Sequence, residues 1–208
     1  MRPKSRGMTL LELMTAVAIV SISVGLSVAG YQTANRKQRG ANAAREMLAE
    51  IAKARKLAVT TAQPVRFVVR NVTEGGRQVR RGRWEQLRRD TGWERSAMPM
   101  AACQSRLCGV GGCLCDATGR EVDVPAEVTV NWNNDVATSG VCFLPGTGEA
   151  RRGWRCLDTD PALATGSLSL TFAHDVPRHI MVDGTTGQVR LFDCGSANKA
   201  GAPTTGCP

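Results

Sequence analysis

The residues in this chain best suited to chemistry are its cysteines. All eight lie in the second half of the sequence. An even number of clustered cysteines is typical of oxidising compartments, where thiols pair as disulfides. We therefore expect disulfides, in a connectivity that the sequence leaves open, among Cys103, Cys108, Cys113, Cys115, Cys142, Cys156, Cys194 and Cys207. Closeness along the chain favours pairing Cys142 with Cys156 and Cys194 with Cys207.

An alternative for the first four cysteines is a structural zinc site, with His174 or His179 as a further ligand. Structural zinc usually uses chelating pairs two to four residues apart, and the gaps between Cys103, Cys108 and Cys113 fit that spacing poorly. A cysteine nucleophile would need a histidine beside a reduced thiol, and no serine triad or phosphate loop is present. We expect no metal, no cofactor and no enzyme activity.

Residues 66–95 form a second group, with nine arginines, four acidic residues and two tryptophans. Such a cluster can hold a phosphate backbone by charge and stack bases on the rings. A solvated hairpin with no ligand is the interpretation we favour. The candidate nucleic-acid contacts are Arg80, Arg81, Arg83, Arg88, Arg89 and, near the C-terminus, Arg190. The formal charge of +9 permits contact with nucleic acid or an anionic membrane and does not choose between them.

Glu12 is the only charged residue between Met8 and Gly30. About 23 residues at ~1.5 Å each give ~35 Å of helix, enough to cross ~30 Å of hydrocarbon. A carboxylate there costs about 2.5–3.5 kcal/mol, which makes Glu12 a functional hypothesis with a partner to be found. If the chain is cut between Gly7 and Met8, the new Met8 amine of one copy can neutralise Glu12 of its neighbour.

The short basic segment 1–7 allows three interpretations of this N-terminus. They are a secretory signal peptide cut after Ala29, a plain membrane anchor, and an anchor whose leader is removed before Met8. Three basic residues precede the apolar stretch and three follow it closely. The positive-inside rule therefore gives no orientation. The expected disulfides place the C-terminal domain outside the cytoplasm.

One long helix is expected to carry these N-terminal residues. Apolar residues recur three and four apart over 31–63, and Pro64 limits the helix end. We therefore expect an amphipathic helix that continues the membrane-spanning segment 8–30.

After Pro64 the pattern favours strands. We expect them at 65–70, 78–87, 128–132, 141–144 and 168–172, with a closing hairpin of 178–182 and 188–192. One carboxylate at Asp183 is too few for calcium, so we expect a plain turn there. Ala97 to Gly119 shows no period and predicts a long loop. The fold class is α+β, with the helix packed on an antiparallel β-sheet domain over 64–208.

The stretch Arg6-Gly7-Met8-Thr9-Leu10-Leu11-Glu12-Leu13-Met14 resembles the processing signal of type IV pilins and pseudopilins. Its marks are a short basic leader, Gly before the cut, an apolar first residue and Glu at the fifth mature position. Met8 stands where that family commonly has Phe. The resemblance implies a pilin-like fold, cleavage by prepilin peptidase after Gly7, methylation of the Met8 amine, and assembly through Met8 and Glu12.

Within that family the chain is similar to the FimT/FimU minor pilins and the H-type general secretion pseudopilin (GspH). Three segments carry the similarity: Ala54-Arg55 with Ala58 before Pro64-Val65, then residues 141–148 around Pro145-Gly146, and residues 180–182 leading to 187–190. The stretch Cys103 to Cys115 has no counterpart in this subgroup.

This resemblance implies a minor pilin of a type IV pilus, a structural subunit of the tip or priming complex. Its partners would be other minor pilins, the major pilin and prepilin peptidase. The precursor would sit in the inner membrane with a periplasmic C-terminal domain, and the mature subunit at the pilus tip. The alternatives are the H-type pseudopilin of type II secretion and a DNA-binding minor pilin. The Gly-Arg-x-Arg motif of DNA-binding FimT proteins appears here as Gly187-Gln188-Val189-Arg190, without its first arginine.

Overall fold

The structure, a computed structural model, describes residues 9–88, 101–126, 128–131, 138–157, 160, 163, 165–172 and 178–193. The chain divides into two compact units, residues 1–39 and 40–208. The long helix α1, Leu10–Thr61, belongs to both units. Its apolar N-terminal part is long enough to cross a membrane, and none of that part is buried in the protein.

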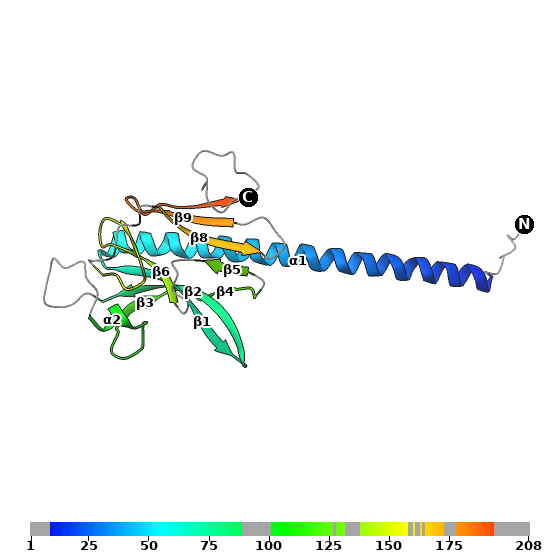
Figure 1. Cartoon of the computed structure of the whole chain (residues 1–208), viewed down its shortest axis with the longest axis horizontal. Helices are drawn as coiled ribbons and strands as arrows, with labels where there is room; N and C mark the ends of the chain where they lie inside the picture. The colour runs from blue at the N-terminus through cyan, green and yellow to red at the C-terminus, as the bar shows by residue number, and fades with distance from the viewer. Residues whose placement is uncertain are drawn as a thin grey trace, which may run out of the picture. The chain divides into compact units, whose positions relative to one another are not determined.

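The second unit is built mainly from antiparallel strands (Figure 1). In its described part, one sheet has the order β3-β2-β1-β6-β7, with β4 also paired to β2, and the other has the order β10-β9-β8-β5. The bounds in the first sheet are β1 Val65–Glu74, β2 Arg77–Leu87, β3 Cys115–Thr118, β4 Val122–Val124, β6 Thr138–Phe143 and β7 Ala150–Arg152. Those in the second are β5 Val128–Asn131, β8 Thr165–Phe172, β9 Arg178–Asp183 and β10 Val189–Asp193.

The second half of α1 supplies the centre of the main apolar core. Its fully buried residues recur three and four apart, as one face of a helix must: Ala44, Met47, Ile51, Ala54 and Ala58. They share one cluster with Phe67 and Trp84 of the first sheet and with Ile180 and Val182 of the second. The strands of the two sheets accordingly lie on either side of this half of the helix (Figure 1).

Strands β1 and β2 alternate between that core and the opposite face. Phe67 pairs with Trp84 on the core side, and Arg66 pairs with Glu85 on the other side. The turn between the strands contains Gly75 and Gly76, both with positive φ, as a type I′ hairpin requires. The face away from α1 carries a second cluster, formed by Leu87 and four buried cysteines.

The predicted fold class is confirmed, and the loop prediction is corrected. Within the stretch 97–119 the structure has a short helix, α2 Ala101–Ser105, and strand β3. Strands β4 and β7 also had no counterpart in the prediction. All four elements have five residues or fewer, too few to show a period of their own. The end of the expected strand at Trp132 lies outside the described residues.

Candidate functional site

The N-terminal end of α1 holds Glu12 in a capping box. Glu12 N donates to Thr9 Oγ1 at 3.3 Å, and Thr9 N donates to Glu12 Oε2 at 3.4 Å. This reciprocal pair satisfies two amides that a helix start leaves without partners. The Thr-x-x-Glu spacing is visible in the sequence, but sequence reasoning missed it. Gly7 and Met8 lie outside the described residues, so the cleavage site and its amine stay predictions.

The apolar part of α1 exposes its side chains all round. Leu10, Leu11 and Ile22 are 77%, 74% and 66% exposed. The serines in this part bond back to their own helix: Ser21 Oγ donates to Val17 O, Ser23 Oγ to Ile19 O, and Ser27 Oγ to Ser23 O, at 2.8–2.9 Å. Such bonds leave no hydroxyl in need of water, which suits a helix surrounded by lipid or by other helices.

The arginines of the β1–β2 hairpin are held by carboxylates of their own domain. Glu121 forms ion pairs with Arg70 at 2.7 Å, Arg83 at 3.3 Å and Arg81 at 3.5 Å. Its negative charge offsets a repulsion between like charges, because Arg70 and Arg81 are directly opposite in the β1–β2 register. Arg81 also pairs with Glu74 at 2.6 Å and Asp123 at 2.7 Å.

This arrangement balances the charge of four of the six arginines on the hairpin. The four arginines Arg66, Arg70, Arg81 and Arg83 face the four carboxylates Glu74, Glu85, Glu121 and Asp123, so the formal sum is zero. Two of these acids come from the segment 121–123, which sequence reasoning did not associate with the cluster. Proximity in the fold, not in the sequence, supplies these counter-charges.

Two other candidate nucleic-acid contacts have local partners as well. Arg88 pairs with Asp116 at 2.9 Å, and Arg190 donates to Gln188 Oε1 at 3.3 Å. The pKa of Asp116 is lowered by hydrogen bonds from Arg88 and then Gln63. Arg80 is also engaged in an interaction, and Arg89 lies outside the described residues. Within the described residues, few guanidinium groups of this hairpin are therefore available to bind a phosphate backbone.

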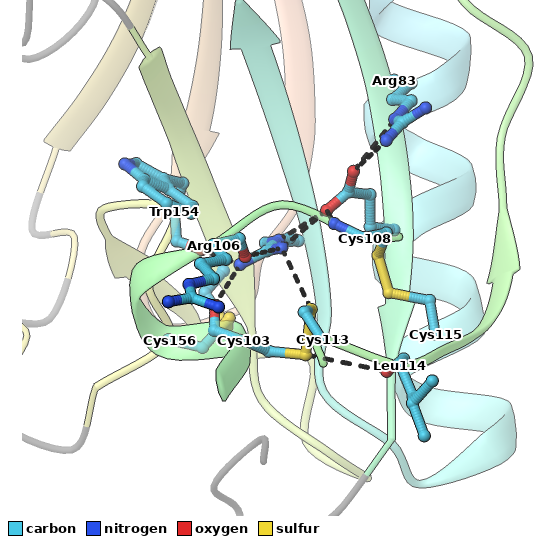
Figure 2. A network of polar contacts seen from close by, with 12 residues as sticks. Arg83, Cys103, Arg106, Cys108, Cys113, Leu114, Cys115, Trp154 and Cys156 are labelled. Atoms are coloured by element: carbon cyan, nitrogen blue, oxygen red, sulfur yellow. Dashed lines mark hydrogen bonds and ion pairs between the residues drawn. A yellow bond between two sulfur atoms is a disulfide. The ribbon is translucent and has the colours of Figure 1, made fainter. Parts of the chain in front are cut away.

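The buried end of the cluster is the ion pair between Arg66 and Glu85, whose side chains are both 0% exposed. Arg66 Nη2 lies 2.7 Å from Glu85 Oε2, and Arg83 Nη2 lies 2.6 Å from Glu85 Oε1 (Figure 2). Burial lowers the pKa of Arg66, and the charge of Glu85 opposes that shift. A pair this deep requires further hydrogen bonds to offset its desolvation.

The cysteine-rich loop, residues 101–115, supplies two of those hydrogen bonds, and the loop after β7 supplies the third. Arg66 donates to Cys103 O at 2.7 Å, Arg106 O at 2.8 Å and Trp154 O at 3.2 Å. Its guanidinium carbon also lies 5.0 Å from the centre of the Trp154 ring. One guanidinium therefore holds together strand β1, helix α2 with the loop that follows it, and the loop after β7 (Figure 2).

Three disulfides tie those loops down: Cys103–Cys113, Cys108–Cys115 and Cys142–Cys156. The last is the pairing that closeness in sequence favours, whereas the proposed pairing of Cys194 with Cys207 lies outside the described residues. The sulfurs of Cys108, Cys113 and Cys115 lie within 4.8 Å of one another, a spacing that also suits a metal ion. Each is already bonded to another sulfur, so the zinc alternative lacks the thiolates that it requires.

His179 lies buried in β9 of the second sheet, and His174 lies outside the described residues. Neither histidine is placed beside a free thiol within the described part of the chain, where all cysteines are bonded.

The segments quoted for the subgroup resemblance meet at one junction. Arg55 Nε donates to Thr186 O at 2.7 Å, and Gly146 N donates to Ala58 O at 3.0 Å. Gly187 and Gly148 both have positive φ, and a Cβ on Gly187 would collide with the Gly148 carbonyl. Helix α1, the turn after β6 and the turn after β9 thus close on each other around one arginine.

The turn at Asp183 is held by hydrogen bonds and needs no ion. Thr186 N and Thr186 Oγ1 both donate to Asp183 Oδ1 at 2.7 Å. The backbone bond from Thr186 is the main cause that lowers the pKa of Asp183. This is the plain turn that the sequence predicts.

Residues 2–28 match the family model for the prokaryotic N-terminal methylation motif. Comparison with curated proteins and with solved structures gave no match. The motif indicates a type IV pilin-like or pseudopilin protein, a structural class, made as a membrane-anchored precursor.

Proposed function

We propose that this protein is a minor pilin of a type IV pilus, a subunit of the tip or priming complex that initiates assembly. Prepilin peptidase cuts the precursor after Gly7 in the inner membrane, and the Met8 amine is methylated. The β-domain folds in the periplasm, and the mature subunit then joins other minor pilins and the major pilin at the pilus tip.

The observation that carries this proposal is the position of the methylation motif. It lies on the exposed apolar half of a helix whose second half forms the core of a β-domain. A single helix therefore serves both as membrane anchor and as the support of the domain. Removal of the leader would leave that helix with an apolar surface for packing against other helices.

Minor status rests on the subgroup resemblance, and the junction at Arg55 supports it. Three segments that are individually short, and far apart in the sequence, contact one another through Arg55, Gly148 and Gly187. Because the three segments have to fit together, they form one structural feature. Their combined occurrence therefore supports the subgroup resemblance more strongly than any one segment alone.

Assembly would use Glu12 and the Met8 amine. The capping box engages Glu12 Oε2 only with the amide of its own Thr9, across a long 3.4 Å bond. Because α1 begins at Leu10, the amine and the carboxylate lie at the same end of the helix. The carboxylate of one subunit can therefore accept hydrogen bonds from the Met8 ammonium of a neighbour and form an ion pair with it, while it continues to cap its own helix.

The first test is the N-terminal sequence and intact mass of the mature protein from its host. We expect a start at Met8 with a methylated amine, and no such product from Gly7→Val. A start at Gly30 would instead show a secreted domain and overturn the proposal.

Assembly needs a separate test. We expect Glu12→Gln to be processed normally but to be missing from sheared pili. Glu46→Gln is the matched control, since it removes an exposed carboxylate from the same helix outside the apolar part. Equal incorporation of both variants would contradict the role of Glu12.

The H-type pseudopilin of type II secretion is the alternative that shares every motif named above. Deletion of the gene separates the two. Loss of surface pili with normal export of secreted proteins supports the pilus, and the reverse result supports the secretion system.

A DNA-binding minor pilin is the other alternative, and the ion pairs that engage four of the six hairpin arginines disfavour it. A gel shift with full-length protein in detergent tests it at low salt, where phosphate contacts are strongest. A salt-sensitive shift that is lost in Arg80→Gln would restore the DNA hypothesis.

A further inference from the structure

Four cysteines of the cysteine-rich loop bring their sulfurs to one place. The sulfurs of Cys108, Cys113 and Cys115 lie within 4.8 Å of one another, and Cys103 is bonded to Cys113, so a fourth sulfur adjoins the group (Figure 2). Ligand sulfurs at ~2.3 Å from a tetrahedral Zn²⁺ lie ~3.8 Å apart. The group is therefore almost as compact as a four-thiolate zinc site, although in the disulfide form none of its sulfurs is a thiolate.

Two side chains of the first sheet hold this loop without using its sulfurs. Arg66 donates to Cys103 O at 2.7 Å and to Arg106 O at 2.8 Å. Glu85 Oε2 accepts the amide of Cys108 at 3.3 Å. Both side chains are fully buried, so water does not compete strongly for these bonds. None of the bonds requires a disulfide, and we therefore expect Cys103 and Cys108 to stay in place when the disulfides are reduced.

The backbone of the loop also turns back on itself without help from the sulfurs. Gly109 N donates to Cys113 O, and Cys113 N donates to Val110 O, each at 3.1 Å. Gly109 and Gly112 have positive φ, a backbone conformation that glycine adopts readily. The chain can therefore turn sharply before Cys113, as a loop that surrounds a single ion must.

Arg66 also brings a positive charge to the sulfurs. Its Nη2 donates to Cys113 Sγ at 3.9 Å. A neighbouring cation favours a thiolate over a thiol, and metal binding requires thiolates. Four thiolates around one Zn²⁺ carry a net negative charge, which this guanidinium partly offsets. Arg66 shares its charge with Glu85, whose other oxygen is held by Arg83.

We propose that, in their thiol form, Cys103, Cys108, Cys113 and Cys115 bind one Zn²⁺ as a structural four-thiolate site. Sulfur ligands in a tetrahedral arrangement favour zinc over the hard cations Mg²⁺ and Ca²⁺. The loop therefore has two alternative closures, a pair of disulfides or a single metal ion. A newly made chain begins with thiols, so the zinc form precedes the disulfide form.

Conversion of the zinc form to the disulfide form is a thiol–disulfide exchange. The four thiolates lose four electrons to two molecules of a disulfide oxidant. Two S–S bonds form in the loop, the two S–S bonds of the oxidant break to give four thiolates that take up protons, and Zn²⁺ is released. Until that step the ion keeps the four sulfurs from pairing with Cys142 or Cys156, which belong to the same buried cluster. This inference requires only the folded β-domain and does not rest on the proposed function.

The test uses the full-length protein in detergent, without oxygen. A water-soluble trialkylphosphine reduces the disulfides; each reduction consumes one phosphine and one water and gives one phosphine oxide and two thiols. After the phosphine is removed, Co²⁺ is added as a visible probe of tetrahedral sites. We expect d–d and sulfur-to-cobalt bands that saturate at one Co²⁺ per chain, and Zn²⁺ should abolish them because thiolates favour zinc. The disulfide form should show no such bands.

Paired variants locate the site. Cys103→Ser with Cys113→Ser should weaken Zn²⁺ binding by more than about 100-fold, since the loss of an outer partner of a ligand alone costs about 10–100-fold. The matched control is Cys142→Ser with Cys156→Ser, which also removes two thiols and one disulfide and should keep the bands. The proposal is overturned if the native reduced chain gives no tetrahedral bands, if the first variant keeps them, or if both variants lose them equally.

A second control removes the two cysteines outside the described residues. Cys194→Ser with Cys207→Ser should leave the bands unchanged, and their loss would show that the ion is held elsewhere. Near-ultraviolet circular dichroism follows the fold of each reduced sample. If reduction alone unfolds the β-domain, Zn²⁺ should restore the native spectrum in both control variants but not in Cys103→Ser with Cys113→Ser. No restoration in the controls would also overturn the proposal.

Discussion

The β1–β2 hairpin and residues 36–39 of α1 are both rich in basic side chains, but they differ in the acidic residues that the sequence places near them. On the hairpin, Glu121 alone contacts three guanidinium groups, and Glu85 holds the buried Arg66. Around residues 36–39 the sequence has no acidic residue within a helical turn in either direction. The arginines of the densest cluster are therefore largely engaged by acids of their own domain, so a count of arginines in the sequence does not by itself locate an anion-binding surface.

Among changes to the hairpin, removal of the buried acid Glu85 should have the largest effect on stability. Glu85→Gln leaves Arg66 charged in a site with no exposure, and we expect a loss of about 3–5 kcal/mol in the free energy of unfolding. Chemical denaturation measures it. Glu149→Gln, at a partly exposed pair with Arg151, should cost under about 1 kcal/mol.

A double variant distinguishes charge burial from packing. Arg66→Met with Glu85→Leu removes both charges and keeps apolar volume, so it should recover much of the lost stability. If the double variant were less stable than Glu85→Gln alone, the hydrogen bonds from Arg66 to the cysteine-rich loop would matter more than the ion pair itself.

The next largest effect on stability should come from loss of the disulfide Cys142–Cys156, whose loop contains Trp154, a carbonyl acceptor of Arg66. Cys142–Cys156 closes a sequence separation of 14, and its replacement by two serines should cost about 3 kcal/mol. Thermal unfolding under non-reducing conditions measures the loss. The Glu85→Gln penalty should shrink in this background, because Trp154 lies within the loop that the disulfide closes; strictly additive losses would show that the two features are independent.

Glu121→Gln should remove part of the counter-charge that distinguishes the hairpin. It leaves three partly exposed arginines with less counter-charge, at a cost of about 1 kcal/mol in stability. We also expect stronger retention on heparin at low salt. Asp123→Asn is the control, since Asp123 is 68% exposed and contacts only Arg81 among these arginines, and it should change both quantities less.

The smallest effect is on acid stability. The pKa of Asp116 is lowered in the folded chain by Arg88 and Gln63, so the unfolded chain binds the proton more readily. The stabilisation is therefore complete above the unfolded pKa and is lost as the pH falls through the lower, folded pKa. Melting temperatures from pH 5 to pH 2 should fall less steeply in Asp116→Asn than in the native chain; parallel curves would contradict this.

Sequence reasoning predicted the parts whose signal is local. The long helix and the hairpins follow from residue periods and turn residues, so α1, β1–β2 and β9–β10 lie within a few residues of their expected places. It missed α2, β3, β4 and β7, which are too short to show a period. It also missed the pairing of Cys103 with Cys113 and of Cys108 with Cys115, because four neighbouring cysteines favour no single pairing by distance along the chain.

The candidate site shows the same division. The capping box of Thr9 and Glu12 is a three-residue spacing that the sequence displays openly. The counter-charges from Glu121 and Asp123 are not visible in this way, since they reach the arginines only after β4 pairs with β2. Long-range pairing thus decided which arginines are satisfied, and no local pattern carries that information.

The junction at Arg55 has a consequence for the order of events during synthesis. The bond from Arg55 to Thr186 joins residues 131 apart, so the turn that completes it is made after most of the chain. At about 5–20 residues per second, the roughly 119 residues between Thr61 and Ile180 take about 6–24 s to appear. During that interval the finished apolar face of α1 lacks Ile180 and Val182, which complete its core cluster, so the nascent subunit exposes part of that face to aggregation and to proteases.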